Sequence, residues 1–257
     1  MKFAMRCLFG VFTITAMLLV SLPLTAQEDL APDDELARQI LARADEIRFP
    51  SEGFQVDIDV TSTTAGAEPE TRKYRVLSKG TENTVVMILE PAEERGQIIL
   101  MKGRDLWVFM PDVAQPIRLG FSQRLTGQVA IGDITRANFS GDYTPHILRS
   151  ERVDGQEHYV LQLSAVDRGV TYHRVLLWVN KANYRPYKAE FYSLSNRLLK
   201  TCSYQDFKPL AGRVRPTRLV MEDPLRQGNV SIVQYGQMRM RDLPDRVFTK
   251  EYLKRLQ

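Results

Sequence analysis

Cysteine and histidine are scarce in this chain of 257 residues, which contains two cysteines and three histidines. Cys7 lies in the N-terminal stretch, so the rest of the chain has a single thiol, Cys202, and can form no internal disulfide. We interpret Cys202 as a small buried hydrophobe, with a reactive thiol as the less favoured alternative. The histidines have no acidic partners at the spacing of metal ligands, and Gly120-Phe121-Ser122 is only the first half of a nucleophile elbow. The sequence therefore predicts no catalytic residue, no metal site and no cofactor.

Blocks of like charge, internal repeats and low-complexity tracts are also absent from the sequence. The formal net charge is +4 and falls to +2 without Lys2 and Arg6, so nothing indicates nucleic acid as a partner. The remaining chain of about 230 residues is long enough to bury a large core in one β-rich domain.

The first 26 residues have the three parts of a secretory signal peptide. Lys2 and Arg6 form a basic start, an uncharged apolar stretch follows, and small residues precede Gln27. An apolar stretch of about 18 residues is near the lower limit for a membrane span, so an uncleaved anchor is the alternative. The Pro23 break and the small-residue exit favour cleavage after Ala26. The sequence thus predicts a signal peptide at 1–26 and one secreted domain at 27–257.

The hydrophobic pattern of the remaining chain predicts a mainly β domain with a helix at each end. Residues 33–47 place apolar side chains on one helical stripe, and 249–256 form a short closing helix. Between them, residues 54–60 alternate apolar and polar side chains, as in a half-buried strand. Further strands are predicted at 73–78, 84–91, 146–153, 157–164, 171–180, 186–193, 198–207, 215–223 and 229–240. An open sheet of about ten or eleven antiparallel strands tends to curl or close.

One predicted hairpin, residues 95–113, is apolar on both faces. Its strands carry consecutive apolar residues at 98–101 and 106–110, whereas a strand with one wet face alternates. Residues 176–179 repeat this pattern. Both faces of these strands must therefore be covered, and we expect helices on one face and a lid or a ligand on the other.

Residues 120–145 form a long connection that is rich in Gly, Ser and Thr and only weakly periodic. We expect one short helix in it, near 131–138. Long loops in compact domains are often functional, so this segment is predicted to be a lid or a docking loop.

Two long blocks of the chain resemble the outer-membrane lipoprotein-sorting proteins, a LolA-like family. In residues 90–128 the resemblance lies in Arg95-Gly96, in the Trp-hydrophobic-aromatic-x-Pro run at 107–111, and in the Ser-x-Arg-x-x-Gly motif at 122–127. In residues 175–207 it lies in the Leu-Trp-Val-x-Lys-x-x-Tyr-x-Pro motif that begins at Leu177. Residues 215–223 and 243–256 also fit, so the resemblance covers most of 33–257.

This resemblance implies a LolA/LolB-like fold, a half-open antiparallel β-barrel whose concave side is plugged by helices and holds an apolar cavity for acyl chains. It further implies a monomeric periplasmic carrier or chaperone of lipid or lipoprotein between the two membranes. Members of this branch are linked with lipid-exporting inner-membrane transporters of the resistance-nodulation-division (RND) type. The functional residues of the family's carrier do not match one by one and are not carried over.

The candidate groove residues are large apolar side chains on the doubly apolar strands. They are Ile98, Leu100, Trp107, Phe109, Leu176, Trp178 and Phe191. For any one of them, packing in an ordinary core is the competing interpretation. Candidate residues for a polar rim or a docking surface are Arg95, Ser122 and Arg124, which could instead form a surface ion pair or cap turns.

Two other functions compete with the carrier. A docking module of an envelope transporter or assembly complex would carry no lipid, and a cavity filled by its own side chains would support it. An enzyme is the third hypothesis, which a convergent polar cluster inside the cavity would favour.

Overall fold

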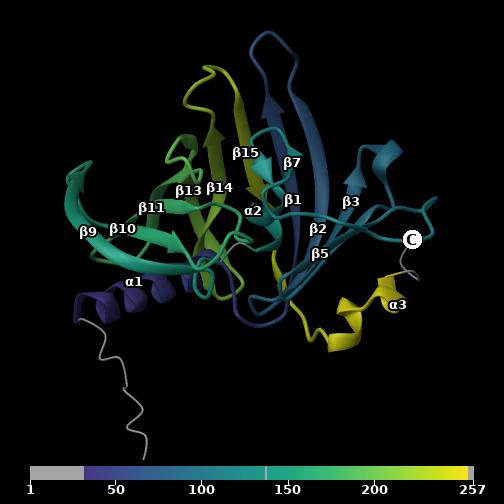
Figure 1. Cartoon of the computed structure of the whole chain (residues 1–257), viewed down its shortest axis with the longest axis horizontal. Coiled ribbons are helices and arrows are strands. Elements are labelled where there is room, and N and C mark those ends of the chain that lie inside the picture. The colour runs from purple at the N-terminus through teal and green to yellow at the C-terminus, as the bar shows by residue number, and fades with distance from the viewer. Residues whose placement is uncertain (1–31, 137, 254–257) are drawn as a thin grey trace, which may run out of the picture. The chain divides into compact units, whose positions relative to one another are not determined.

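The computed structural model describes residues 32–136 and 138–253 (Figure 1). The predicted signal peptide and the last residues of the predicted C-terminal helix lie outside this part of the chain. The described helices are α1 (Pro32–Arg48), α2 (Ile131–Thr135) and α3 (Lys250–Leu253), with 3₁₀ turns η1 (Ala92–Glu94) and η2 (Asp245–Phe248). No helix among the described residues is both long enough and apolar enough to cross a membrane.

One large antiparallel sheet contains nearly all the strands. Its order is β6-β5-β4-β3-β2-β1-β15-β14-β13-β12-β11-β10-β9, and β16 pairs with β1 beside this path. One half comprises β1 (Phe54–Thr63), β2 (Glu70–Lys79), β3 (Asn83–Glu90), β4 (Ile98–Lys102), β5 (Asp105–Phe109) and β6 (Ile117–Arg118). The other comprises β9 (Tyr143–Val153), β10 (Gln156–Ala165), β11 (Arg174–Asn180), β12 (Pro186–Tyr192), β13 (Leu198–Leu210), β14 (Arg213–Glu222), β15 (Val230–Tyr235) and β16 (Arg239–Met240).

The two halves are antiparallel meanders that join where β1 pairs with β15. Within the described residues, edge strands β6 and β9 do not pair with each other, so the sheet is curled but not closed. The predicted fold class is confirmed. The predicted number of strands was too low, because the short strands β6, β7, β8 and β16 span only two or three residues each and leave no periodic signal.

Helix α1 packs its apolar stripe into the inner core of the sheet. Ala37, Ile40 and Ala44 are buried there, whereas Leu36, at the helix start, is largely exposed. The C-terminal end of the helix is held by Arg215 of β14, whose Nη1 atom donates to the carbonyl oxygen of Glu46 at 2.5 Å. A cation at this end of a helix satisfies carbonyl groups that have no partner within the helix and interacts favourably with the helix dipole.

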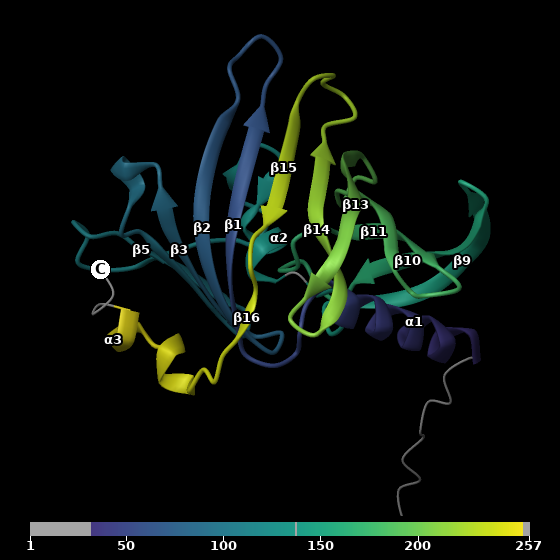
Figure 2. The ribbon, with the colours of Figure 1, turned by 180° about the vertical axis from the view of Figure 1, so that it is seen from behind.

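The doubly apolar hairpin β4–β5 separates two apolar clusters, one on each face of the sheet. On the inner face, Ile99, Met101 and Leu106 belong to the main core. On the outer face, Ile98, Leu100, Trp107 and Phe109 form a second cluster. The side chains that cover this outer cluster come from the C-terminal segment and are Leu243, Val247, Phe248 and Leu253. Figure 2 shows this segment, with α3, beside the strands of the first half. The outer cover of the hairpin is therefore the end of the chain itself.

Strand β11 is also apolar on both faces, but different side chains cover its outer face. Val175, Leu177 and Val179 face the inner core, while Leu176 and Trp178 form a small outer cluster with neighbouring side chains. The ammonium group of Lys188 lies 3.9 Å from the centroid of a Trp178 ring. Long charged side chains can cover apolar surface in this way while their charge stays in water.

We expect Phe248→Ala to lower the free energy of unfolding by about 3–5 kcal/mol, because a fully buried aromatic side chain is removed from the outer cluster. Urea titration followed by circular dichroism measures this change. Leu225→Ala, at a side chain that is 69% exposed, is the control and should change stability by less than about 0.5 kcal/mol. Equal effects of the two substitutions would contradict the assignment of this segment to the core.

Candidate functional site

The segment between the two halves of the sheet folds back against its inner face. We call residues 120–136 and 138–142 the inner segment; it contains β7 (Arg124–Thr126), β8 (Val129–Ala130) and α2. In both views α2 lies against the middle of the sheet, near β1 and β15 (Figures 1 and 2). Gly127, with φ of 50°, makes the closest approach: a Cβ atom there would lie 2.1 Å from Oγ of Ser62 and 2.3 Å from Oγ of Ser231. A larger residue would force the segment away from the sheet.

Two cavities lie between this segment and the sheet. The first is largely apolar, and its lining includes Phe54, Val56, Ile58, Val76 and Ile134. The second is aromatic and polar, and its lining includes Arg48, Tyr143, Tyr172, Phe191, Cys202 and Tyr204. Both are bounded by Phe49, Arg136 and Tyr235. The free volume of each is about 20 Å³, which is room for about one water molecule. In this conformation both cavities are filled by side chains of the chain itself.

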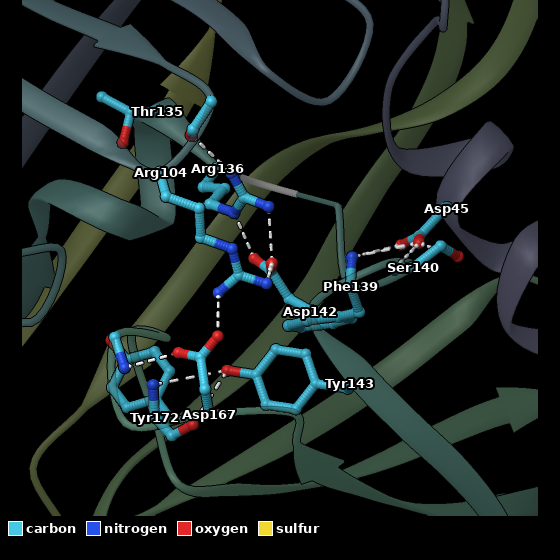
Figure 3. Close-up of polar contacts among 12 residues, drawn as sticks. Asp45, Arg104, Thr135, Arg136, Phe139, Ser140, Asp142, Tyr143, Asp167 and Tyr172 are labelled. Carbon is cyan, nitrogen blue, oxygen red and sulfur yellow. Dashed lines mark hydrogen bonds and ion pairs between the residues drawn. The ribbon is translucent and has the colours of Figure 1, made fainter.

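The carboxylate of Asp45 on α1 attaches the inner segment to the helix. It accepts hydrogen bonds from the backbone nitrogen atoms of Phe139, at 3.0 Å, and Ser140, at 2.7 Å, and from Oγ of Ser140 at 2.8 Å (Figure 3). Asp45 is 4% exposed, so these bonds are shielded from water. Charge-assisted bonds to a buried carboxylate are stronger than neutral ones, and breaking them leaves buried groups unpaired.

A second attachment joins α2 to the other half of the sheet. Lys200 of β13 forms a buried ion pair with Asp133 of α2 and donates to the carbonyl oxygen of Gln128 at 2.9 Å. The third proton of the ammonium group can point to Sδ of Met221 at 3.6 Å. The hydroxyl group of Tyr172 donates to Asp133 at 2.9 Å. All the N–H donors of Lys200 therefore have partners. We interpret this cluster as a structural contact that holds α2 against β13.

A third set of contacts connects the two ends of the curled sheet (Figure 3). Asp142, at the entrance to β9, is paired with Arg136 of the inner segment and, at 3.3 Å, with Arg104. Arg104 is in the β4–β5 turn and also pairs with Asp167 at 2.8 Å, while Arg136 donates to the carbonyl oxygen of Gly103 at 2.8 Å. These pairs link the β4–β5 turn, near one edge of the sheet, with the start of edge strand β9, across the side on which the sheet does not close.

Cys202 lines the aromatic cavity and is buried. Burial raises the pKa of its thiol to about 12, so the group is almost entirely protonated near pH 8. A protonated thiol is a poor nucleophile, which fits the interpretation of Cys202 as a small hydrophobe. Among the described residues, no group of three or more His, Cys, Asp or Glu side chains could hold a metal ion.

Most of the predicted groove residues lie away from these cavities. Phe191 lines the aromatic cavity, in contact with Tyr172 at 4.5 Å between ring centroids. The other six belong to the two outer clusters and are Ile98, Leu100, Trp107, Phe109, Leu176 and Trp178. They lie on the face of the sheet opposite the two cavities, because alternate residues of a strand point to opposite faces. The inner-facing positions of the same strands, such as Ile99 and Leu177, were overlooked.

The predicted rim residues do not form one group. Arg95 is exposed and its Nε atom donates to the carbonyl oxygen of Leu89 at 3.1 Å, a local contact. Ser122 and Arg124 do lie together, at a polar cleft of about 180 Å³ that Lys200 also borders. These two remain candidates for a rim beside the inner segment.

The hydrophobic pattern of the sequence did not indicate the buried polar residues of the site. Asp45 and Arg48 lie on the helix that was expected to contribute only an apolar stripe, and Asp133 and Lys200 are far apart in the chain. Charged residues inside an otherwise apolar stripe are the one signal that could have indicated Asp45.

The comparisons with known proteins agree on the fold. A family model described as "-like: Uncharacterized protein" matches residues 80–255. No curated protein matches the chain. Among solved structures, the LolA superfamily protein NE2245 from Nitrosomonas europaea is 60% identical over 84% of this chain and 98% of that one, with a TM-score of 0.81.

Two more distant structures share the fold. A protein described as an outer membrane lipoprotein-sorting domain, from Vibrio parahaemolyticus, is 22% identical over 86% of this chain and 99% of its own, with a TM-score of 0.72. A DUF1329 family protein from Desulfovibrio piger is 21% identical over the same shares, also with a TM-score of 0.72. The curled, unclosed sheet with a helix-plugged inner face is thus a LolA-like fold. This chain belongs to the LolA superfamily, as the sequence resemblance predicted.

We expect Asp45→Asn to loosen the inner segment, because the neutral amide loses the charge that strengthens the bonds from Phe139 and Ser140 and, with its oxygen at their side, turns an N–H donor toward Arg48. The readout is alkylation of Cys202 by iodoacetamide at pH 8, followed by mass spectrometry of the peptide that carries it. The thiol is buried and protonated in the closed state, so its reaction reports opening. The rate should rise about tenfold or more.

The matched control for this experiment is Glu46→Gln, at the next residue of α1. The Glu46 carboxylate pairs with Arg213 at 2.7 Å on the surface, away from the inner segment. Its substitution should leave the alkylation rate unchanged. If Asp45→Asn alkylates no faster than Glu46→Gln, the carboxylate of Asp45 does not hold the inner segment in place.

Proposed function

We propose that this protein is a periplasmic carrier that binds lipid or lipoprotein acyl chains on its inner face and passes them between components of the cell envelope. The observation that supports this most directly is the apolar cavity between α2 and the sheet, lined by Phe54, Val56, Ile58 and Val76. It lies in a chain of the LolA superfamily, with a fold shared by a protein described as a lipoprotein-sorting domain.

Movement of the inner segment would supply the space that the closed cavities lack. Burial of an acyl chain stabilises it by about 0.8 kcal/mol per methylene group. A chain of about 16 carbons would therefore outweigh the loss of several hydrogen bonds of about 1–3 kcal/mol each. The attachments through Asp45 and Lys200 would re-form when the cargo leaves, so the same bonds that keep the empty cavity dry would favour release.

The proposal includes the compartment, the cargo and the donor of this carrier. The predicted cleavage after Ala26 would release the domain into the periplasm. The resemblance further leads us to propose lipoprotein or lipid cargo bound for the outer membrane, and an inner-membrane transporter of the RND type as the donor. The protein would act as a monomer, because a single chain contains the whole cavity.

A docking module is the second candidate, and a specific observation favours it. Each inner cavity has a free volume of only about 20 Å³ and is filled by the chain's own side chains. A protein that only docks on an envelope complex needs no larger space. The two functions differ in one measurable respect, which is whether the inner face accepts an acyl chain.

The test is native mass spectrometry of the protein, expressed from its full-length gene and purified from periplasm without detergent. We expect a bound mass that is released as phospholipid or acylated peptide. In Ile134→Glu, which places a carboxylate of α2 at the apolar cavity, this bound mass should be lost. Ile117→Glu, at a side chain that is 46% exposed, introduces the same charge on the surface and should retain it.

Thermal unfolding of each variant shows whether it is folded. A wild-type protein that carries no lipid, and acquires none from vesicles of bacterial phospholipid, would overturn the carrier and leave the docking module. Retention of the lipid by a folded Ile134→Glu variant would place the site elsewhere on the molecule.

A further inference from the structure

Arg48 is a cation buried inside the aromatic cavity. It is the last residue of α1, and 7% of it is exposed. Its guanidinium carbon lies 4.1 Å from the centroid of the Phe139 ring and 5.6 Å from that of Tyr204. An arginine remains charged in such a place, because its pKa lies far above neutral pH.

The hydrogen-bonding capacity of this cavity is only partly used. Nη1 of Arg48 donates to Oδ1 of Asp45 at 3.1 Å, but its Nε atom has no partner among the described residues. Arg48 thus presents a buried N–H group that no residue of the described chain satisfies. Tyr204 and Tyr235 line the same cavity and are buried. A buried polar group without a partner costs about 1–3 kcal/mol, so a ligand that satisfies it is favoured by a similar amount.

The anions near Arg48 are already engaged by other groups. Asp45 accepts hydrogen bonds from the backbone of Phe139 and Ser140, and it accepts only one hydrogen bond from Arg48. Asp133 is paired with the buried ammonium of Lys200. The aromatic cavity therefore has one cation with an unused donor, beside the side chains of Tyr204 and Tyr235.

We propose that Arg48, with Tyr204 and Tyr235, binds the oxyanion of a single-chain anionic amphiphile, a carboxylate or a phosphate, whose chain occupies the neighbouring apolar cavity. This inference rests on the proposed carrier function and specifies the chemistry of its cargo. Tyr235 borders both cavities, so the head and the chain of one ligand would lie on either side of it. The head group points inward and the chain lies beneath α2.

Matched probes test the charge of the ligand. Dansyl-labelled undecanoic acid and its primary amide differ only in the carboxylate, and their fluorescence gives a Kd for each. The wild-type protein should bind the acid at least about tenfold more tightly than the amide. Arg48→Gln should bring the ratio of the two Kd values close to one. Arg43→Gln, on the same helix with its guanidinium 4.6 Å from the exposed side of Tyr184, is the control and should keep it.

Competition distinguishes an amphiphile from a free anion. Oleate and lysophosphatidate should displace the dansyl acid, and inorganic phosphate should not. Displacement by phosphate alone would overturn the amphiphile in favour of a simple anion site. Equal binding of acid and amide by the wild type would overturn the role of Arg48 while the carrier function stands. Failure of both probes to bind would overturn the carrier function itself, and this inference with it.

A measurement on the wild-type protein keeps the inference testable if Arg48→Gln does not fold. Oleate labelled with ¹³C at its carboxyl group can be titrated in the complex by nuclear magnetic resonance. A guanidinium donor stabilises the carboxylate, so the bound carboxyl group should titrate at a lower pH than the same oleate in neutral vesicles. A bound carboxyl group that titrates at the same or a higher pH would overturn the proposed contact.

Discussion

The constraint on which the structure depends is that an antiparallel sheet of this size curls without closing. The inner face of this curled sheet is too apolar to be left bare, so other parts of the chain must cover it. Here the inner segment and α1 fill it, and three polar attachments hold them there: Asp45 with the backbone of the inner segment, Lys200 with Asp133, and Arg104 with Asp142. Each attachment joins elements that are distant in the chain, so the filled state depends on the whole fold.

The same constraint accounts for the outer face. The hairpin β4–β5 is apolar on both sides because it is covered on both sides, by the core within and by the C-terminal segment outside. The outer cover consists of nonpolar contacts, in which Phe248 is the largest fully buried side chain. The inner cover combines nonpolar contacts with a small number of buried polar bonds. Nonpolar contacts have no direction, so surfaces held by them alone can slide past each other. A hydrogen bond is either formed or broken, so the inner segment is better suited than the outer cover to switch between a closed and an open state.

The position of Arg48 links this architecture to the chemistry of the cargo. A carrier that recognises acyl chains by nonpolar area alone cannot separate one lipid from another, because such contact has no direction. In the proposed carrier, the buried guanidinium of Arg48 in the aromatic cavity would add that direction. Arg48 lies on α1 beside the carboxylate that holds the inner segment, so the proposed ligand recognition and closure would lie one helical turn apart.

The sequence by itself determined the elements of this protein: the helix near residue 33, the long strands, the hairpin turn at 102–105 and the short helix near 131. Local patterns decide these features, because period, turn residues and breakers act over a few neighbours. It also determined that β4, β5 and β11 are covered on both faces. The packing of the whole sheet determines which face is inner: it places Trp107 and Trp178 in the outer clusters, Arg48 at the aromatic cavity, and the polar contacts of Asp45 and Lys200 against the inner segment. Alternation shows which side chains share a face of a strand, but the direction of the curl and the pairing of distant charges are set by the packing of the whole sheet.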